Sequence, residues 1–267
     1  MQRIVVCGAC GRMGKRIIAC AAEDPGIAVA GAVERAGHPC LGADAGACAG
    51  VGEIGVAVSA DLEAAARGAD VIVDFSGRET AVRNAAAAAS LGMPIVIGTT
   101  GLGEEQLHPI RAAAEKVACV VAPNMSVGAN LLIEIAAETA RLLGDDYDVE
   151  IVETHHRMKK DAPSGTALAL ARAVAGARGI DLPGAVVYGR SGHPGARPKG
   201  QIGIHAVRQG DVVGDHVVGF AAPGERIELV HRATSRDTFA RGALRAAKWV
   251  AKKAPGIYGM ADVLREG

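Results

Sequence analysis

Residues 155–166, HHRMKKDAPSGT, concentrate groups that can hold an anion and move a proton. The cationic or titratable side chains are His155, His156, Arg157, Lys159 and Lys160. The chain as a whole is neutral, with 29 Lys+Arg against 29 Asp+Glu, so this positive charge is local. The Pro-Ser pair that follows predicts a helix start, where backbone N–H groups can bind a carboxylate. Those N–H groups belong to Ser164, Gly165 and Thr166.

Two other interpretations of this stretch exist. It can be a solvated basic turn with its histidines satisfied in a sheet, which we would favour for an isolated charge run. A metal site is less favoured, because adjacent histidines rarely share one ion and Asp161 alone is a poor third ligand. If a strand continues through His155 and His156, the two side chains point to opposite faces, and both reach one ligand only if the strand twists or breaks.

A glycine loop near the N-terminus is the second candidate site. Gly8, Gly11 and Gly14 directly follow an apolar strand and open a helix. Such a turn lets the backbone approach a pyrophosphate, and the helix N-terminus presents N–H groups to it. The spacing is GxxGxxG instead of the commoner GxGxxG, and the chain has 36 glycines, so a βα turn without a ligand is the alternative.

Residues at three further strand ends extend this site. Glu34 ends the second predicted strand, where an acidic residue usually bonds the ribose hydroxyls of a dinucleotide, and Arg35 offers a guanidinium for a 2′-phosphate. The pair predicts use of both NADH and NADPH, with a surface ion pair as the alternative. The turns GTTG (98–101) and APNMS (122–126) follow two more predicted strands, at the edge where ligands of such folds bind.

The elements around these motifs predict an α/β domain over residues 1–126. Apolar runs at 4–7, 27–33, 71–75, 94–98 and 118–123 alternate with helical patterns at 12–23, 62–69, 78–92 and 104–117. Continuous apolar runs are typical of parallel strands buried on both faces, so the sequence predicts a Rossmann-like, doubly wound parallel sheet. Residues 36–55 are glycine-rich and polar, so we expect them to leave the sheet and form a surface excursion, a loop without regular strands.

The pattern changes after residue 126 and predicts a smaller α+β domain over residues 127–236. Helices are predicted at 126–144 and from 164 to about 178, and strands at 147–156, 186–188, 201–208, 211–221 and 226–233. The last four strands have no helix between them, which favours a mixed or antiparallel sheet. Residues 236–253 predict a final helix, whose domain the periodicity does not determine.

Composition excludes several classes of protein. The 267 residues are 49% hydrophobic and 22% charged, as in a globular protein with an apolar core. Zero net charge argues against nucleic acid as the main partner, and no apolar run is long enough for a membrane helix. The six cysteines lack paired metal-ligand spacing, so we expect free thiols, no metal and a cytoplasmic protein.

Seven segments, in order along nearly the whole chain, carry a family resemblance. They are VVCGACGRMG, ERAGHPCLGADAG, VIVDFS, IGTTG, APNMSVGANL, ETHHRMKKDAPSGTALA and GERIELVHRATSRDTFARGALRAA. Together they resemble the dihydrodipicolinate reductase (4-hydroxy-tetrahydrodipicolinate reductase) family of the diaminopimelate route to lysine. HHxxKxDAPSGTA is the most specific of them.

The resemblance implies an activity and an organisation. The family reduces a cyclic dicarboxylate with hydride from NADPH or NADH, and a small dicarboxylate explains why a neutral chain concentrates charge at 155–160. It has an N-terminal dinucleotide domain and a C-terminal substrate domain, usually forms homotetramers through the second sheet, and returns its last helix, here about 237–267, to the first domain.

The resemblance also implies roles for individual residues. His155 matches the proposed proton donor or acceptor, and Lys159 the proposed proton donor. His156 and the Gly165–Thr166 turn, with Ser164 before it, match substrate contacts. The cofactor contacts are Gly8, Ala9, Cys10, Gly11, Arg12, Met13, Glu34, Arg35, Gly98, Thr99, Thr100, Ala122, Pro123, Asn124 and Met125. The alternatives are another two-domain reductase of an imine or semialdehyde, and a non-catalytic nucleotide sensor.

Overall fold

The computed structural model describes residues 1–266 and divides into two compact units. The first unit comprises Met1–Val127 together with the chain from Arg236 onward, and the second comprises Gly128–Ser235. Each unit has a sheet and a hydrophobic core of its own.

The first unit contains a seven-stranded parallel sheet. Its strands are β1 (Gln2–Cys7), β2 (Ile27–Val33), β3 (Val58–Ser59), β4 (Val71–Asp74), β5 (Ile95–Ile97), β6 (Ala118–Val121) and β12 (Gly256–Tyr258), in the order β12-β6-β5-β4-β1-β2-β3. The chain proceeds outward from β1 to β3, then returns to the other side of β1 for β4. This confirms the doubly wound prediction and places the reversal between β1 and β4.

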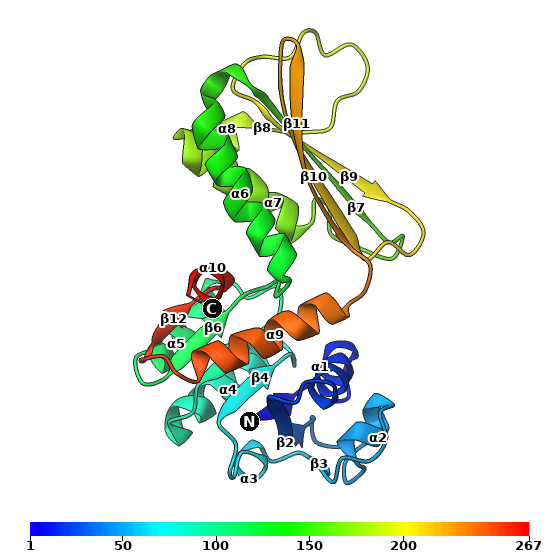
Figure 1. Ribbon diagram of the computed structural model, residues 1–267, viewed down its shortest axis with the longest axis vertical. Helices are drawn as coiled ribbons and strands as arrows, with labels where there is room; N and C mark the ends of the chain where they lie inside the picture. The colour runs from blue at the N-terminus through cyan, green and yellow to red at the C-terminus, as the bar shows by residue number, and fades with distance from the viewer. Residues whose placement is uncertain (267) are drawn as a thin grey trace. The chain divides into compact units, whose positions relative to one another are not determined.

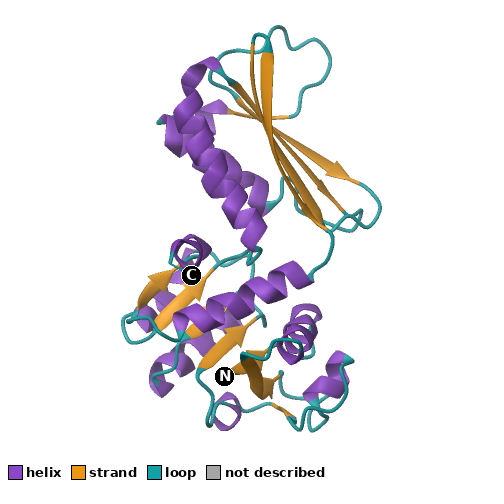
Figure 2. Cartoon of the chain, viewed as in Figure 1, coloured by secondary structure: helices purple, strands orange, loops and turns teal. Residues whose placement is uncertain are grey.

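Helices cover both faces of this sheet (Figure 2). On one face lie α1 (Arg12–Ala22) and α9 (Asp237–Val250), joined by an ion pair between Arg16 and Asp237 at 2.6 Å. On the other face lie α4 (Arg78–Leu91) and α5 (Glu104–Ala114). Strand β1 alternates between these two cores, since Ile4 packs with the first pair and Val5 with the second. Shorter helices are α2 (Ala45–Ala49), α3 (Leu62–Ala65) and α10 (Met260–Arg265).

The prediction of one C-terminal helix over about 237–267 is wrong beyond Val250. The sequence KKAPG ends α9, because proline removes a helix donor and Gly256 has a φ of 159°. The chain then forms β12, which pairs in parallel with β6, and ends in α10. Three-residue strands such as β12 carry too little periodicity to be recognised in the sequence.

The second unit is a mixed five-stranded sheet with helices packed on one face (Figure 1). Its strands are β7 (Asp148–His155), β8 (Val186–Tyr188), β9 (Ile202–Arg208), β10 (Gly214–Ala222) and β11 (Glu225–Ala233), in the order β11-β10-β7-β9-β8. Strands β7, β9 and β8 run parallel and β10 and β11 pair antiparallel, which confirms the mixed sheet. The helices are α6 (Val127–Leu143), α7 (Gly165–Arg178) and α8 (Leu182–Ala185). None of the helices within residues 1–266 is both long and apolar enough to cross a membrane.

Candidate active site

The strand register of the second sheet places the candidate catalytic residues next to one another. Side chains alternate between the faces of β7, so Glu153 and His155 share the face that packs Val149 and Ile151 against α7. Across the sheet, His216 of β10 pairs with Glu153, and Arg208 of β9 pairs with His155. Three strands therefore contribute to one cluster.

Glu153 is the centre of this cluster. Its side chain is fully buried, so an unpaired carboxylate there would be costly. The nitrogens that surround it are Arg208 Nη1 at 2.7 Å, Arg208 Nη2 at 2.8 Å, His155 Nδ1 at 2.6 Å and the Ser164 backbone N–H at 3.0 Å. The two Arg208 contacts form a bidentate pair, the strongest geometry for a guanidinium and a carboxylate.

The charges of this pair fix the tautomer of His155. Burial alone would raise the pKa of Glu153, but hydrogen bonds from Arg208 and His155 outweigh it and hold the pKa below its usual range. Burial lowers the pKa of His155, and Glu153 offsets only part of that effect. Near neutral pH the imidazole is therefore neutral, with Nδ1–H donating to Glu153 and the lone pair left on Nε2.

His216 packs behind His155 and is almost fully buried. The two rings lie edge to face, with centroids 5.3 Å apart, and His216 Nε2 lies 3.0 Å from Ser164 Oγ. Burial, followed by the neighbouring His155, lowers the pKa of His216 to about 4. Within residues 1–266, its Nδ1 has no hydrogen-bond partner.

Helix α7 begins against Glu153. Ser164 is its N-cap, accepting a hydrogen bond from Ala167 N–H at 3.2 Å, while its own N–H donates to Glu153. Ser164 is buried and supports the helix start, with its N–H bonded to Glu153. Gly165 is exposed and Thr166 is half-buried in the first turn. Their substrate contacts remain a prediction.

The cationic residues follow the end of β7. Because β7 ends at His155, the half-buried His156 lies beyond the strand, and strand alternation no longer directs it to the opposite face. Lys159 N–H donates to the His156 carbonyl at 3.1 Å, and Lys159 Nζ pairs with Asp161 at 2.8 Å. The Lys159 charge is close enough to lower the pKa of His155 further, whereas Lys160 is exposed.

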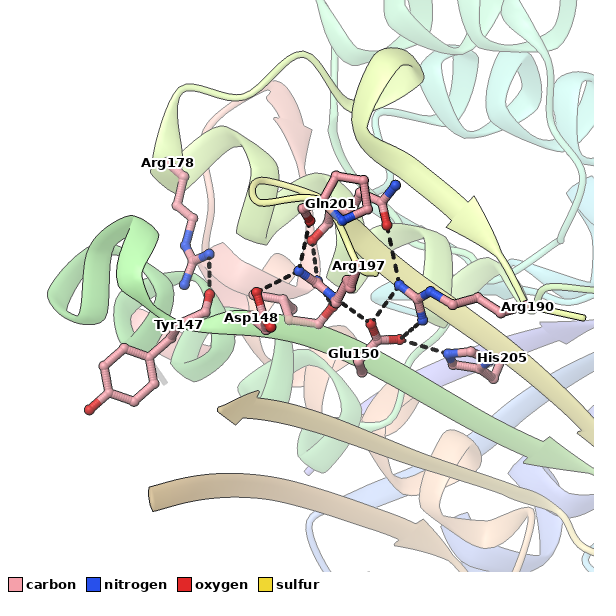
Figure 3. Close-up of polar contacts among 10 residues, drawn as sticks. Tyr147, Asp148, Glu150, Arg178, Arg190, Arg197, Gln201 and His205 are labelled. Atoms are coloured by element: carbon pink, nitrogen blue, oxygen red, sulfur yellow. Dashed lines mark hydrogen bonds and ion pairs between the residues drawn. The ribbon is translucent and has the colours of Figure 1, made fainter. Parts of the chain in front are cut away.

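On the opposite face of β7, Glu150 anchors the segment between β8 and β9 (Figure 3). Its carboxylate contacts Arg190, Arg197 and His205 at 2.9, 3.0 and 2.7 Å. Burial alone would raise the pKa of Glu150, but these hydrogen bonds lower it to about 2. Arg197 also donates to the Gln201 carbonyl at 2.6 Å. The network therefore fixes residues 190–201 against the strand that carries Glu153.

In the first unit, the glycine loop lies at the reversal point of the sheet. Gly8 has a φ of +74°, and a Cβ added to Gly14 would lie 2.1 Å from the Gly8 carbonyl oxygen. Helix α1 therefore starts in direct contact with the loop, as a dinucleotide-binding turn requires. Of the other predicted loop residues, Ala9 is buried, Cys10 and Met13 are half-buried, and Gly11 and Arg12 are exposed.

Glu34 connects the end of β2 to this loop. Its carboxylate accepts hydrogen bonds from Cys10 N–H at 3.2 Å and from Arg35 N–H at 3.0 Å, and the Arg35 side chain is exposed. An acidic side chain at this point, beside a loop without side-chain bulk, fits the ribose end of a dinucleotide. The predicted cofactor residues thus meet here, although their contacts with a cofactor remain predictions.

The two other predicted turns follow β5 and β6. In the first, Gly98 N–H donates to the Asp74 carbonyl and the Thr99 hydroxyl to the buried Asp74 carboxylate, both at 2.9 Å, while Thr100 is exposed. Burial raises the pKa of Asp74 despite these hydrogen bonds. In the second turn, Ala122 and Met125 are buried, Asn124 is half-buried and Pro123 is exposed.

Sequence reasoning missed Glu153, Arg208 and His216. A signal for Glu153 existed, because VEIVETH places it in step with Val149 and Ile151 on the apolar side of a strand. Its partner Arg208 lies 55 residues away, so only the register of β7 and β9 reveals the pair.

Burial of His216 makes the second unit sensitive to acid. Its folded pKa, about 4, is below the ordinary value of 6.5, so the unfolded chain binds more protons between these values. The resulting stability is complete above pH 6.5 and is lost as the pH falls toward 4. We expect the free energy of unfolding to decrease by at most about 3 kcal/mol from this group.

Denaturant titrations from pH 7 to pH 4 measure this effect. The slope of unfolding free energy against pH should become shallower in His216→Asn, and it should keep its wild-type value in His193→Asn, which alters an exposed histidine between β8 and β9. An unchanged slope in His216→Asn would show that this imidazole is not held neutral by the fold.

Comparison with known proteins identifies the family of the chain. The dihydrodipicolinate reductase N-terminus model matches residues 2–125, and the C-terminus model matches residues 128–264. A 4-hydroxy-tetrahydrodipicolinate reductase from Anaeromyxobacter dehalogenans (strain 2CP-C) is 53% identical over 99% of this chain and 98% of its own. The enzyme of that name from Syntrophus aciditrophicus (strain SB) is 50% identical with the same coverage.

Solved structures extend the comparison. A dipicolinate-bound dihydrodipicolinate reductase from Paenisporosarcina sp. TG-14 superposes with a TM-score of 0.76 at 25% identity, covering 97% of both chains. An amine dehydrogenase from Mycobacterium smegmatis, with a TM-score of 0.61 at 16% identity over 96% of this chain and 94% of its own, shares the fold alone. The two family models together span nearly all of the sequence, and the chain belongs to the dihydrodipicolinate reductase family.

Proposed function

We propose that this chain is a 4-hydroxy-tetrahydrodipicolinate reductase, which converts that cyclic dicarboxylate to tetrahydrodipicolinate in the route to diaminopimelate and lysine; the ring loses its hydroxyl group as water and gains a hydride and a proton. The relatives that carry this name are about half identical over 99% of the chain. The observation that carries the proposal is the buried pair of Glu153 and His155 beside Lys159 and the start of α7.

The first unit holds NADPH or NADH in this proposal. The glycine loop from Gly8 to Met13 accommodates the pyrophosphate, Glu34 binds the adenosine ribose, and Arg35 is exposed for a 2′-phosphate. The turns at 98–100 and 122–125 line the nicotinamide end. The bound nicotinamide supplies the hydride.

The second unit holds the substrate and supplies the proton. The exposed first turn of α7, with Gly165 and Thr166, and the cation-rich segment around His156 bind the two carboxylates, because a helix N-terminus attracts anions. Lys159 carries the proton that the reduced ring receives, and its neighbour Asp161 pairs with the ammonium group. Neutral His155, held by Glu153, presents Nε2 as a proton acceptor or relay.

We propose further that the enzyme works in the cytoplasm as a homotetramer assembled through the second sheet. The face of that sheet opposite α7 carries a row of valines in register, with Val230 beside Val217 and Val217 beside Val152, and Val230 is 45% exposed. An apolar row of this kind supports contact between copies of the chain.

Lys159→Ala should decrease kcat/KM by about 10²–10⁴-fold, the usual contribution of a positioned proton donor. The measurement is NADPH or NADH consumption with substrate generated in situ by a coupled synthase. Lys160→Ala, which removes the adjacent exposed ammonium group, is the matched control and should retain most activity.

Nucleotide binding to the same variants separates the possible outcomes. Retained NADPH binding with lost turnover in Lys159→Ala would support the assigned role. Tight nucleotide binding without turnover in the wild type would favour a nucleotide sensor or a reductase of another imine. Equal losses in both lysine variants would indicate that general positive charge, and not Lys159 itself, is required.

Arg35→Ala should raise KM for NADPH roughly tenfold, because the variant loses a charge-assisted contact to the 2′-phosphate. It should leave KM for NADH nearly unchanged. NADH is the internal control, since it lacks the 2′-phosphate. Steady-state kinetics with each nucleotide measure the ratio. A parallel rise for both nucleotides would mean that Arg35 supports the loop and does not recognise the phosphate.

A further inference from the structure

A cluster of soft ligands at the glycine loop includes side chains to which the proposed function gives no role. One ligand atom from each of Cys10, His38 and Cys40 lies within 4.8 Å of the others, and all three residues are half-buried. We propose that this cluster, with Cys48 as fourth ligand, is a binding site for a thiophilic divalent cation such as Zn²⁺.

The separations suit such an ion. Tetrahedral Zn²⁺ binds sulfur at about 2.3 Å and imidazole nitrogen at about 2.0 Å, so its ligand atoms lie roughly 3.5–3.8 Å apart. Each separation in the observed cluster needs to shorten by about 1.3 Å at most to reach that geometry. The Cys48 thiol lies beside those of Cys40 and Cys10 but outside the 4.8 Å cluster, so its side chain must move inward to serve as fourth ligand.

The ligands lie on segments that the fold holds in place. The Cys10 N–H is bonded to Glu34 at the end of β2. Turns fix the 38–43 segment, where Leu41 N–H donates to the His38 carbonyl and Ala43 N–H to that of Cys40, at 3.1 and 3.0 Å. This positioning lets ligands that are distant in sequence act together.

Asp44 fixes the last ligand, Cys48, by capping the helix that carries it. The Asp44 carboxylate accepts hydrogen bonds from the backbone N–H groups of Gly46, Ala47, Ile54, Gly55 and Val56. One side chain therefore closes the loop around α2, and the predicted surface excursion at 36–55 has a defined conformation. The spacing of the cysteines in sequence predicted no metal site because two ligand segments, 8–11 and 38–48, meet only in the fold.

Binding exchanges protons for the ion. A cysteine binds such a cation as thiolate, so each coordinated thiol gives up its proton. His38 Nδ1 accepts a hydrogen bond from Cys40 N–H at 3.2 Å. Coordination through either ring nitrogen ends that bond, since Nδ1 then holds the ion or the ring proton.

Co²⁺ titration of the reduced full-length chain under argon tests the site. We expect a near-ultraviolet thiolate-to-cobalt band and the intense visible bands of tetrahedral Co²⁺, saturating at one equivalent, with both removed by added Zn²⁺. The thermal unfolding temperature should rise with Zn²⁺, because the ion binds the folded chain. Cys40→Ser and His38→Gln should each weaken the bands and the thermal shift.

Cys119→Ala is the matched control, because Cys119 is a buried thiol in β6 outside the cluster, and it should keep the wild-type spectrum. Only weak octahedral Co²⁺ bands in the wild type would overturn the proposal, as would strong bands that persist in both His38→Gln and Cys40→Ser. A disulfide among Cys10, Cys40 and Cys48 that forms in place of metal binding, detected by thiol counting and peptide mapping, would also overturn it. Because His38 lies on a surface turn, His38→Gln provides the test even if Cys40→Ser fails to fold.

Discussion

The buried carboxylate of Glu153 is the interaction on which the candidate site in the second unit depends. A charge in such an environment is stable only when its partners satisfy it, and removing one partner typically costs several kcal/mol, about 3–5. Arg208 supplies the opposite charge, His155 and Ser164 supply further donors, and these come from β9, β7 and the start of α7. One charge thus fixes a strand pairing, a histidine tautomer and a helix terminus.

Strand β7 also carries Glu150, whose role is to anchor a neighbouring segment. Glu150 points to the opposite face and holds Arg190, Arg197 and His205, which immobilises the segment leading into β9. Arg208 lies on β9, directly after that segment. The Glu150 network therefore stabilises the strand whose Arg208 pairs with Glu153. Alternation along a single strand therefore separates an anchoring face from a candidate catalytic face.

The sequence allowed the main architecture and the key segments to be predicted, because their signals are local. Alternating apolar runs and helical patterns indicated the doubly wound sheet, and the stretch from His155 to Thr166 indicated a candidate substrate side, which stays a prediction. The short strands β3 and β12 escaped notice, since two or three residues carry little periodicity. The pattern predicted the last helix to within a few residues of its end at Val250, whereas the extension to about 267 implied by the resemblance missed β12.

Features that depend on distant pairing could not be predicted. The Glu153–Arg208 pair spans 55 residues, and the thiols of Cys10 and Cys40 meet through the loop that Asp44 closes. The hydrogen bond from Ser164 N–H to Glu153 was likewise not foreseen, because nothing in the sequence shows that the two residues meet. In each case a residue contacts a partner from another element, and only the folded structure shows which partner that is.

The protonation state of His155 depends on whether the buried Glu153 is ionised and accepts its Nδ1–H. Proton–nitrogen correlation spectra of the imidazoles near neutral pH, with His155 assigned by the loss of its signals in His155→Gln, report which nitrogen carries the proton. We expect a neutral ring with the proton on Nδ1, as donation to an ionised Glu153 requires. A charged ring, or a neutral one protonated on Nε2, would contradict it.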